Sequence, residues 1–152
     1  MQEVAFTALV HGVYVVTTRV GDKVNGMTAA WVSQVSLKPL LVMVSIAPAR
    51  YSHTLIKESG IFAINVLTAE EAELGKRFGF KSGRKIDKFA GLDYLTAATG
   101  APILPQAYAY FDLKLVDTHP AGDHTLFVGE VLEAKILHPQ SRPLVFNKND
   151  FF

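Results

Sequence analysis

Two segments of the sequence carry small or polar residues that the surrounding strand pattern does not require. The first runs from residue 25 to residue 31 and reads NGMTAAW, with three small residues in a row where a strand begins. Small side chains at such a point let a flat ligand lie against backbone N–H and C=O groups. A tight turn at Asn25-Gly26 is the competing explanation for the first two residues. A turn does not explain the small residues 28–30, which predict a shelf for a flat ligand.

The second segment places a guanidinium group and hydroxyl groups at the start of a predicted short helix. Arg50, Ser52 and Thr54 precede or open this helix, where backbone N–H groups lack partners within the helix. This arrangement suits a phosphate monoester, because N–H donors, hydroxyls and a positive charge converge on one point. The alternative is that Ser52 is only a helix N-cap and Arg50 only a solvated charge.

A third feature is a basic cluster between residues 76 and 88, offset only by Asp87. The cluster fits RNA or a phosphorylated small molecule, and a solvated face is the simplest interpretation of its lysines at 81, 85 and 88. Three phenylalanines of the segment, Phe78, Phe80 and Phe89, fit anchoring in the core better than base stacking. A net charge of +1 argues against a general nucleic-acid surface. The basic members are Lys76, Arg77, Lys81, Arg84, Lys85 and Lys88.

The other polar residues do not form a standard catalytic or metal-binding set. The sequence has no cysteine and no GxSxG, GxxxxGK[ST], HExxH or GxGxxG motif. Its five histidines include no pair with ligand spacing on one element. No apolar run reaches the roughly 20 residues that span a bilayer, and the start lacks a secretory signal. We therefore expect no metal, no membrane contact and a cytoplasmic location.

The chain of 152 residues, 49% of them apolar, is expected to form a single domain over residues 1–152. One short helix is expected to open at Ser52 and close at Gly60, and a second to open with a capping box from Thr68 to Glu71. The segment 80–100 is expected to be irregular. Six or seven strands with short helices between them predict a mainly β, closed or nearly closed antiparallel barrel. The predicted strands cover residues 13–18, 28–37, 40–46, 61–67, 110–116, 124–137 and 143–146.

An ordered set of stretches, at residues 25–33, 35–39, 45–47, 50–56, 62–67, 87–89, 122–131 and 143–146, carries a family resemblance. In this order the stretches resemble the flavin reductase-like, FMN-binding split-barrel proteins. The resemblance implies a six-stranded antiparallel Greek-key split barrel with short inserted helices, a homodimer, and non-covalent FMN near the subunit interface. Two features depart from the family pattern. Leu40 follows Pro39 where many relatives have a second proline, and the family's usual aromatic ending is replaced.

By motif position, the resemblance implies a flavin-binding role for four segments. The flavin ring and ribityl chain would be lined by Asn25, Gly26, Met27, Thr28, Ala29, Ala30, Trp31, Ser45, Ile46 and Ala47. The phosphate would be held by Arg50, Ser52 and Thr54, with Tyr51 beside them, and the pocket closed by Lys76, Arg77 and Phe78. The catalytic candidate is His124, which corresponds to a histidine at the nicotinamide side of the flavin in reductases of this group.

The function that the resemblance implies is NAD(P)H-dependent flavin reduction, with hydride passing from NADH or NADPH to the flavin N5. Backbone N–H groups near residues 28–30 would stabilise negative charge on the ring, and His124 would orient the nicotinamide. Electrons would then pass to free flavin, a ferric chelate or a partner protein. Three alternatives stay open: a flavoredoxin-like FMN protein reduced by a protein partner, a flavin-free barrel for haem or an apolar ligand, and an RNA-binding barrel. The last is the least favoured, so no nucleic-acid partner is expected.

Overall fold

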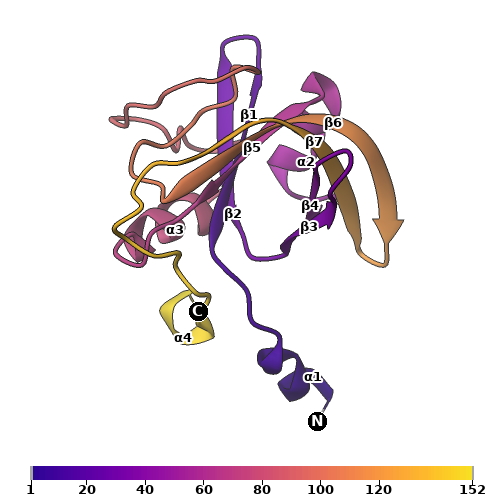
Figure 1. The fold of residues 1–152 in the computed structure, drawn as a ribbon, viewed down its shortest axis with the longest axis vertical. Coiled ribbons are helices and arrows are strands. Elements are labelled where there is room, and N and C mark those ends of the chain that lie inside the picture. Colours follow the sequence, from indigo (N-terminus) through magenta and orange to yellow (C-terminus); the bar gives the residue numbers. More distant parts are fainter. Residues whose placement is uncertain (1, 152) are drawn as a thin grey trace.

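The computed structural model describes residues 2–151 and contains a curved antiparallel sheet of seven strands (Figure 1). The order of the strands is β2-β1-β5-β6-β7-β4-β3, and every neighbouring pair is antiparallel, so the predicted mainly β antiparallel fold is confirmed. The strands are β1 (Tyr14–Val20), β2 (Lys23–Ala29), β3 (Val32–Ser36), β4 (Leu41–Ile46), β5 (Ile61–Val66), β6 (Ala109–Ala121) and β7 (His124–Ile136). The helices are α1 (Gln2–Ala5), the 3-10 helix η1 (Phe6–Ala8), α2 (Tyr51–Ser59), α3 (Ala72–Gly79) and α4 (Lys148–Phe151).

The barrel is split between β2 and β3, the two edges of the sheet. These strands follow one another in the chain, but no ladder joins them within residues 2–151. Ala30 and Trp31 form the link, and the Trp31 carbonyl accepts a hydrogen bond from the Ser45 N–H at 3.0 Å. Because the chain must change direction at this link, the run predicted as one strand over residues 28–37 is divided in two. The sheet therefore has seven strands, within the six or seven predicted from the residues and one more than the resemblance implies. It is an open, split barrel, as the resemblance implies, and not a closed one.

Apolar side chains that alternate along the strands fill two main clusters. One cluster joins β4, β5 and β7, where Val44, Phe62 and Phe127 are fully buried. The other lies beneath α3, where Leu74 and Phe78 pack against β1 and the irregular segment that follows α3. Burial of each such side chain stabilises the fold by about 1.5–3 kcal/mol. This packing fixes β2, β4 and α3, which carry the residues of interest, relative to one another.

Helix α2 ends as the sequence predicts, but it does not begin as predicted. Gly60 takes a left-handed conformation with φ of +71°, and its N–H donates to the Ile56 carbonyl at 2.8 Å. Arg50, not Ser52, occupies the N-cap position, and its side chain makes no capping bond. The Ser52 hydroxyl instead accepts a hydrogen bond from Asn25 on β2. Ser52 is therefore not the helix N-cap.

The predicted capping box of the second helix is wrong. Thr68 pairs with Pro143 in an isolated bridge, so its backbone is extended and does not open a helix. Residues 143–146 do not form the predicted strand: Pro143 and Val145 make isolated bridges to Thr68 and Gly12. Glu71 occupies the N-cap position of α3 without a side-chain cap, and the helix begins at Ala72. The segment between α3 and β6 contains turns and an isolated bridge, in agreement with the irregular segment predicted.

The N-terminal residues 2–10 project from the barrel as an arm (Figure 1). The arm holds α1 and η1, and it exposes the apolar side chains of Val4, Phe6, Leu9 and Val10. Across residues 2–151, none of the helices has the length and apolar character needed to cross a membrane.

Candidate functional site

Two adjoining cavities open where the end of β2, the end of β4 and the C-terminus of α3 meet. The larger cavity has a volume of about 410 Å³ and the smaller one about 220 Å³. Both are lined by Met27, Arg50, Gly79 and Phe80, so they share a wall and together make up one depression. The larger cavity is further lined by Val13, Thr28, Ala29, Ala30, Trp31, Ser45, Ile46, Ala47, His124 and Phe146. The smaller one is further lined by Asn25, Ala49, Tyr51, Ser52, Lys81, Ser82, Gly83 and Lys88.

The small residues at the end of β2 form a shelf, Thr28–Ala30, in the larger cavity. Close packing against α3 positions the shelf: the Thr28 hydroxyl donates to the Gly75 carbonyl at 2.5 Å. A Cβ atom at Gly79 would lie 3.3 Å from Thr28 Cβ, so helix and strand are nearly in contact there. Because the Thr28 hydroxyl is already bonded, the alanines and the backbone form the part of the shelf open to a ligand.

Asn25 lies within β2 and not in a turn. It pairs with Thr18 of β1 and is 3% exposed, so the turn explanation of Asn25-Gly26 is wrong. Its side-chain amide donates to the Ser52 hydroxyl at 2.9 Å, which ties β2 to the start of α2. A Cβ at Gly83 would lie 2.0 Å from Asn25 Oδ1, so only glycine fits at this approach. Asn25 thus bonds β2 to α2 and lies in close contact with Gly83 at the wall of the smaller cavity.

Lys88 is buried, contrary to the solvated face expected for it. Its side chain lines the smaller cavity, and the residue is only 4% exposed. The ammonium donates to the carbonyls of Gly26 at 2.9 Å and Phe78 at 2.8 Å. Burial, and to a smaller extent the nearby charge of Arg50, lowers the pKa of Lys88 from its usual 10.5 to about 8.

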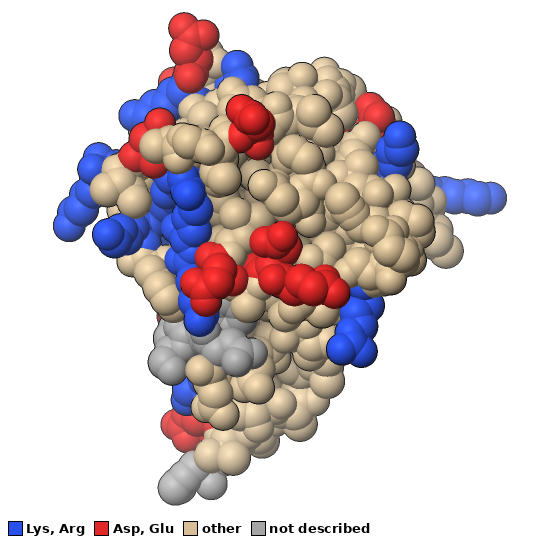
Figure 2. Space-filling view, turned by 90° about the vertical axis from the view of Figure 1, so that its left-hand side faces the viewer, with Lys and Arg blue, Asp and Glu red and all other residues tan. Residues whose placement is uncertain are grey.

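The other members of the basic cluster divide between internal contacts and solvent. Arg77 donates to the carbonyls of Lys88 and Ala90, and Arg84 donates to the Ala49 carbonyl at 3.0 Å. Lys81 and Lys85 are exposed, as expected. Figure 2 shows lysine and arginine side chains gathered along one edge of the face turned to the viewer. The two arginines therefore hold the irregular segment in place, and the cluster is not a uniform charged surface.

The three phenylalanines of this segment have different environments. Phe78 is fully buried and its ring lies 5.0 Å from that of Phe89, centroid to centroid, so both anchor the core as expected. Phe80 is 59% exposed and lines both cavities, so the core role expected for it is wrong. Phe80 therefore places an aromatic face between the shelf and the basic end of the depression.

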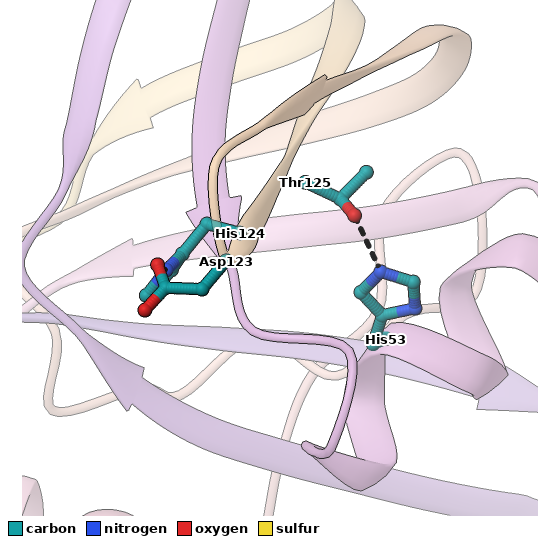
Figure 3. Close-up of polar contacts among 4 residues, drawn as sticks. All are labelled: His53, Asp123, His124 and Thr125. Atoms are coloured by element: carbon teal, nitrogen blue, oxygen red, sulfur yellow. Dashed lines mark hydrogen bonds and ion pairs between the residues drawn. The ribbon is translucent and has the colours of Figure 1, made fainter.

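His124 reaches the larger cavity from the start of β7. Its ring lies 4.9 Å from that of Trp31, and its Nδ1 donates to the Asp123 carboxylate at 2.7 Å. This hydrogen bond lowers the pKa of Asp123. The next residue, Thr125, points to the other side of the strand and bonds the His53 ring of α2 at 2.8 Å (Figure 3). Burial, and then the charge of Lys57, lowers the pKa of His53.

The structure brings most of the predicted site residues to the two cavities. Thirteen residues line them: Asn25, Met27, Thr28, Ala29, Ala30, Trp31, Ser45, Ile46, Ala47, Arg50, Tyr51, Ser52 and His124. Five do not. Thr54 is exposed, Gly26 offers its carbonyl to Lys88, Phe78 is in the core, and Lys76 and Arg77 line a neighbouring hollow. The pocket end of α3 is formed by Gly79 and Phe80 instead of residues 76–78.

Sequence reasoning missed Gly79, Phe80 and Lys88 as cavity residues. Gly79 carried a usable signal, because a glycine at a helix end permits close approach of a strand. Lys88 resembles the other lysines of its cluster, so nothing in its local pattern indicated burial, although the stretch 87–89 contributed to the family resemblance. Within residues 2–151, no group of three His, Asp or Glu side chains is arranged to hold a metal ion.

Comparisons with known proteins place the chain in a family. A family model described as "Flavin reductase like domain" matches residues 6–152. The FMN reductase (NADH) of Agrobacterium fabrum is 38% identical over 147 residues, which cover 97% of this chain and 81% of the relative. The high molecular weight rubredoxin of Moorella thermoacetica is 37% identical, over 96% of this chain but only 64% of that longer protein.

A solved structure has the same fold. The NADH:FAD oxidoreductase of Streptomyces globisporus matches with a TM-score of 0.88 and 29% identity, over 96% of this chain and 87% of that one. The sequence match and the split barrel agree, and the chain belongs to the flavin reductase-like family.

Proposed function

We propose that this chain binds FMN in the two cavities and is an NAD(P)H:flavin oxidoreductase. The observation that carries the proposal is the pair of adjoining cavities, with the flat shelf in the larger one and Arg50, Lys81 and Lys88 at the smaller one. The volume of the larger cavity alone falls within the roughly 300–1,000 Å³ of small-molecule sites. The printed names of the relatives from Agrobacterium and Streptomyces support the same activity.

The residues present fit the two ends of FMN. The shelf at Thr28–Ala30 and the facing segment Ser45–Ala47 suit the flat ring, since they offer backbone groups and short side chains. Arg50 lies at the junction of the cavities, and Ser52 and Lys88 line the smaller one, which suits the phosphate. When bound, FMN supplies the capacity to accept a hydride from NADH or NADPH and to release electrons to flavin, a ferric chelate or a redox protein.

The protein binds the flavin, orients the nicotinamide ring and stabilises charge on the flavin ring. Backbone N–H groups near the shelf favour negative charge on a ligand lying there. Trp31 and His124 form an aromatic pair at the larger cavity, where they orient a nicotinamide ring against the shelf. Asp123 fixes the His124 ring by accepting its Nδ1–H. His124 is therefore an orienting residue, because hydride transfer requires no proton from it.

The proposal includes a homodimer in the cytoplasm. Support for a second copy comes from the exposed apolar side chains of the arm, Val4, Phe6, Leu9 and Val10, which favour a protein contact.

The function is tested with the purified protein and FMN. We expect a bound-flavin absorption band, and its rapid loss when NADH or NADPH is added without oxygen. A band that survives both nucleotides but disappears with a reduced redox protein would show the electron carrier instead. A protein that stays colourless with excess FMN would overturn both.

Replacement of His124 by alanine is expected to raise the KM for the nicotinamide nucleotide about 2- to 10-fold, because one aromatic contact is lost. FMN binding should change less, since His124 does not line the smaller cavity, which holds the phosphate in the proposed function. Steady-state kinetics and flavin titration measure the two effects. His119→Ala, an exposed histidine of the same hairpin, is the matched control. Loss of FMN from His124→Ala with an unchanged KM would contradict this role.

A further inference from the structure

A separate apolar cavity lies among the strands of the barrel. It has a volume of about 510 Å³, is lined from six of the seven strands, and shares no lining residue with the two cavities of the proposed flavin site. None of its lining residues, all of them within residues 2–151, is charged. The side chains of Ser33 and Gln34 donate to carbonyls of their own strand, and Leu40 and Ile136 are about half exposed. This cavity, called the strand groove below, suits an uncharged, apolar occupant.

The N-terminal arm is an apolar segment that has no surface to lie on within its own copy. Residues 4–10 read VAFTALV and carry no charge, and the side chains of Val4, Phe6, Leu9 and Val10 are 57% to 81% exposed. The one hydroxyl of this stretch, on Thr7, donates to the Val4 carbonyl at 2.7 Å. Helical turns as short as α1 and η1 are not stable by themselves in water and depend on packing. The arm therefore requires an apolar surface.

The arm begins beside the strand groove of its own copy but does not fill it. A Cβ atom at Gly12 would lie 2.6 Å from the hydroxyl of Tyr14, which lines the groove. The His11 carbonyl accepts a hydrogen bond from the Phe146 N–H at 2.8 Å, which fixes the chain at the base of the arm. Beyond this bond the arm projects from the barrel (Figure 1). The direction of the fixed base therefore carries the arm away from its own copy.

We infer that the arm of each copy occupies the strand groove of a second copy. Every copy carries both surfaces, and a two-fold axis pairs them reciprocally, so two arms fill two grooves in one closed dimer. Because each arm begins beside a groove, both arms and both grooves lie near the same axis. The inference rests on the homodimer of the proposed function and deepens it, because it names the surfaces that meet.

A second copy accounts for both apolar surfaces at once. A small apolar ligand, or an apolar segment of a different protein, would fill the groove and leave the arm in water. The arm and the groove are both uncharged, so their contact buries no unpaired charge. The match in chemistry, together with the position of the arm's base, favours this chain as its own partner.

The first test is a cross-linking experiment on the double variant Leu9→Cys/Ile136→Cys. The chain has no cysteine of its own, so the two introduced thiols alone react with a short bis-maleimide reagent. We expect a covalent dimer in a denaturing gel, with mass spectrometry showing position 9 of one chain joined to position 136 of the other. A 9–136 link within one chain would place the arm in its own groove and overturn the inference. A dimer without any 9–136 link would overturn it as well.

The matched control for cross-linking is Leu9→Cys/Lys57→Cys. Lys57 is exposed on α2 and does not line the groove, so its cysteine is as reactive as that at position 136. No 9–57 link is expected. A 9–57 link as abundant as the 9–136 link would show an arm without a fixed site and overturn the inference.

The second test places a carboxylate on either side of the contact. Leu9→Asp in the arm and Ile136→Asp in the groove are each expected to raise the dissociation constant of the dimer about 10- to 100-fold, because each buries an unpaired charge. Val116→Asp is the control, since Val116 is 48% exposed on β6 and does not line the groove. Sedimentation equilibrium measures the constants. Unchanged constants in the first two variants, or an equal rise in all three, would overturn the inference.

Failure of the inference is distinguishable from failure of the proposed function. A dimer that reduces FMN with NADH or NADPH but gives no 9–136 link contradicts only the placement of the arm. An unmodified protein that reduces FMN as a monomer contradicts the homodimer and the inference together. A 9–136 link between copies in a protein that reduces no flavin supports the inference and contradicts the proposed activity.

Discussion

Replacement of Arg50 by methionine is expected to weaken FMN binding about 10- to 100-fold and to leave riboflavin binding nearly unchanged. Arg50 lines both cavities, and its guanidinium is the charged group at their junction. Methionine keeps most of the length of the side chain and removes the charge, so the lost free energy is that of charge-assisted hydrogen bonds to the phosphate. Titration of both flavins, followed by fluorescence, measures the difference.

The control for this experiment is Arg142→Met. Arg142 is exposed and lines neither cavity, so its replacement removes one positive charge without touching the site. It should leave both affinities unchanged at moderate salt, where surface charges are screened. If Arg50→Met weakens riboflavin as much as FMN, Arg50 supports the cavity wall and does not hold the phosphate.

Replacement of Phe78 and of Phe80 is expected to affect different properties. The first should lower stability, and the second should weaken flavin binding. Phe78→Ala should lower the free energy of unfolding by about 3–5 kcal/mol, because the ring is fully buried against Phe89 and β2. Phe80→Ala should change it by no more than about 0.5 kcal/mol, since the side chain is 59% exposed. Urea unfolding measures both values.

The same pair should show the opposite order in flavin binding. Phe80 lines both cavities, so its loss is expected to weaken FMN about 2- to 10-fold, through lost aromatic contact. If Phe78→Ala remains folded, any loss of FMN affinity should result from its lower stability. The loss should therefore disappear at low temperature. Equal stability losses in the two variants would contradict the burial described for them.

Most of the fold was predictable because strand formation depends on local alternation and on turn residues. The β-branched runs of β1, β4 and β5 and the glycine that ends α2 are signals contained within a few neighbouring residues. The errors arose where a contact with a residue distant in the chain determines the local structure. Thr68 and Glu71 have the types of a capping box, but Pro143 pairs with Thr68 and keeps the chain extended. The division of the run 28–37 likewise depends on the curvature of the whole sheet.

The site was predictable to the extent that its residues lie in short contiguous segments. The shelf at Thr28–Ala30 and the segment around Arg50 are each recognisable from small or polar residues at an unexpected place. Lys88 was not, because its burial depends on carbonyls 62 and 10 residues away in the chain. Phe80 was not either, because a phenylalanine two positions after a buried one gives no sign of the side to which it turns.

At the start of β7, neighbouring side chains lie on opposite sides of the strand, which affects the substitutions that this position can accept. His124 turns to the cavity, whereas its neighbour Thr125 attaches the strand to α2 through His53 (Figure 3). The bond to α2 and the lining of the cavity thus belong to two neighbouring side chains on opposite sides of the strand. A substitution at position 124 leaves the bond between Thr125 and His53 in place, so under the proposed function the choice between NADH and NADPH can change there with little loss of thermal stability.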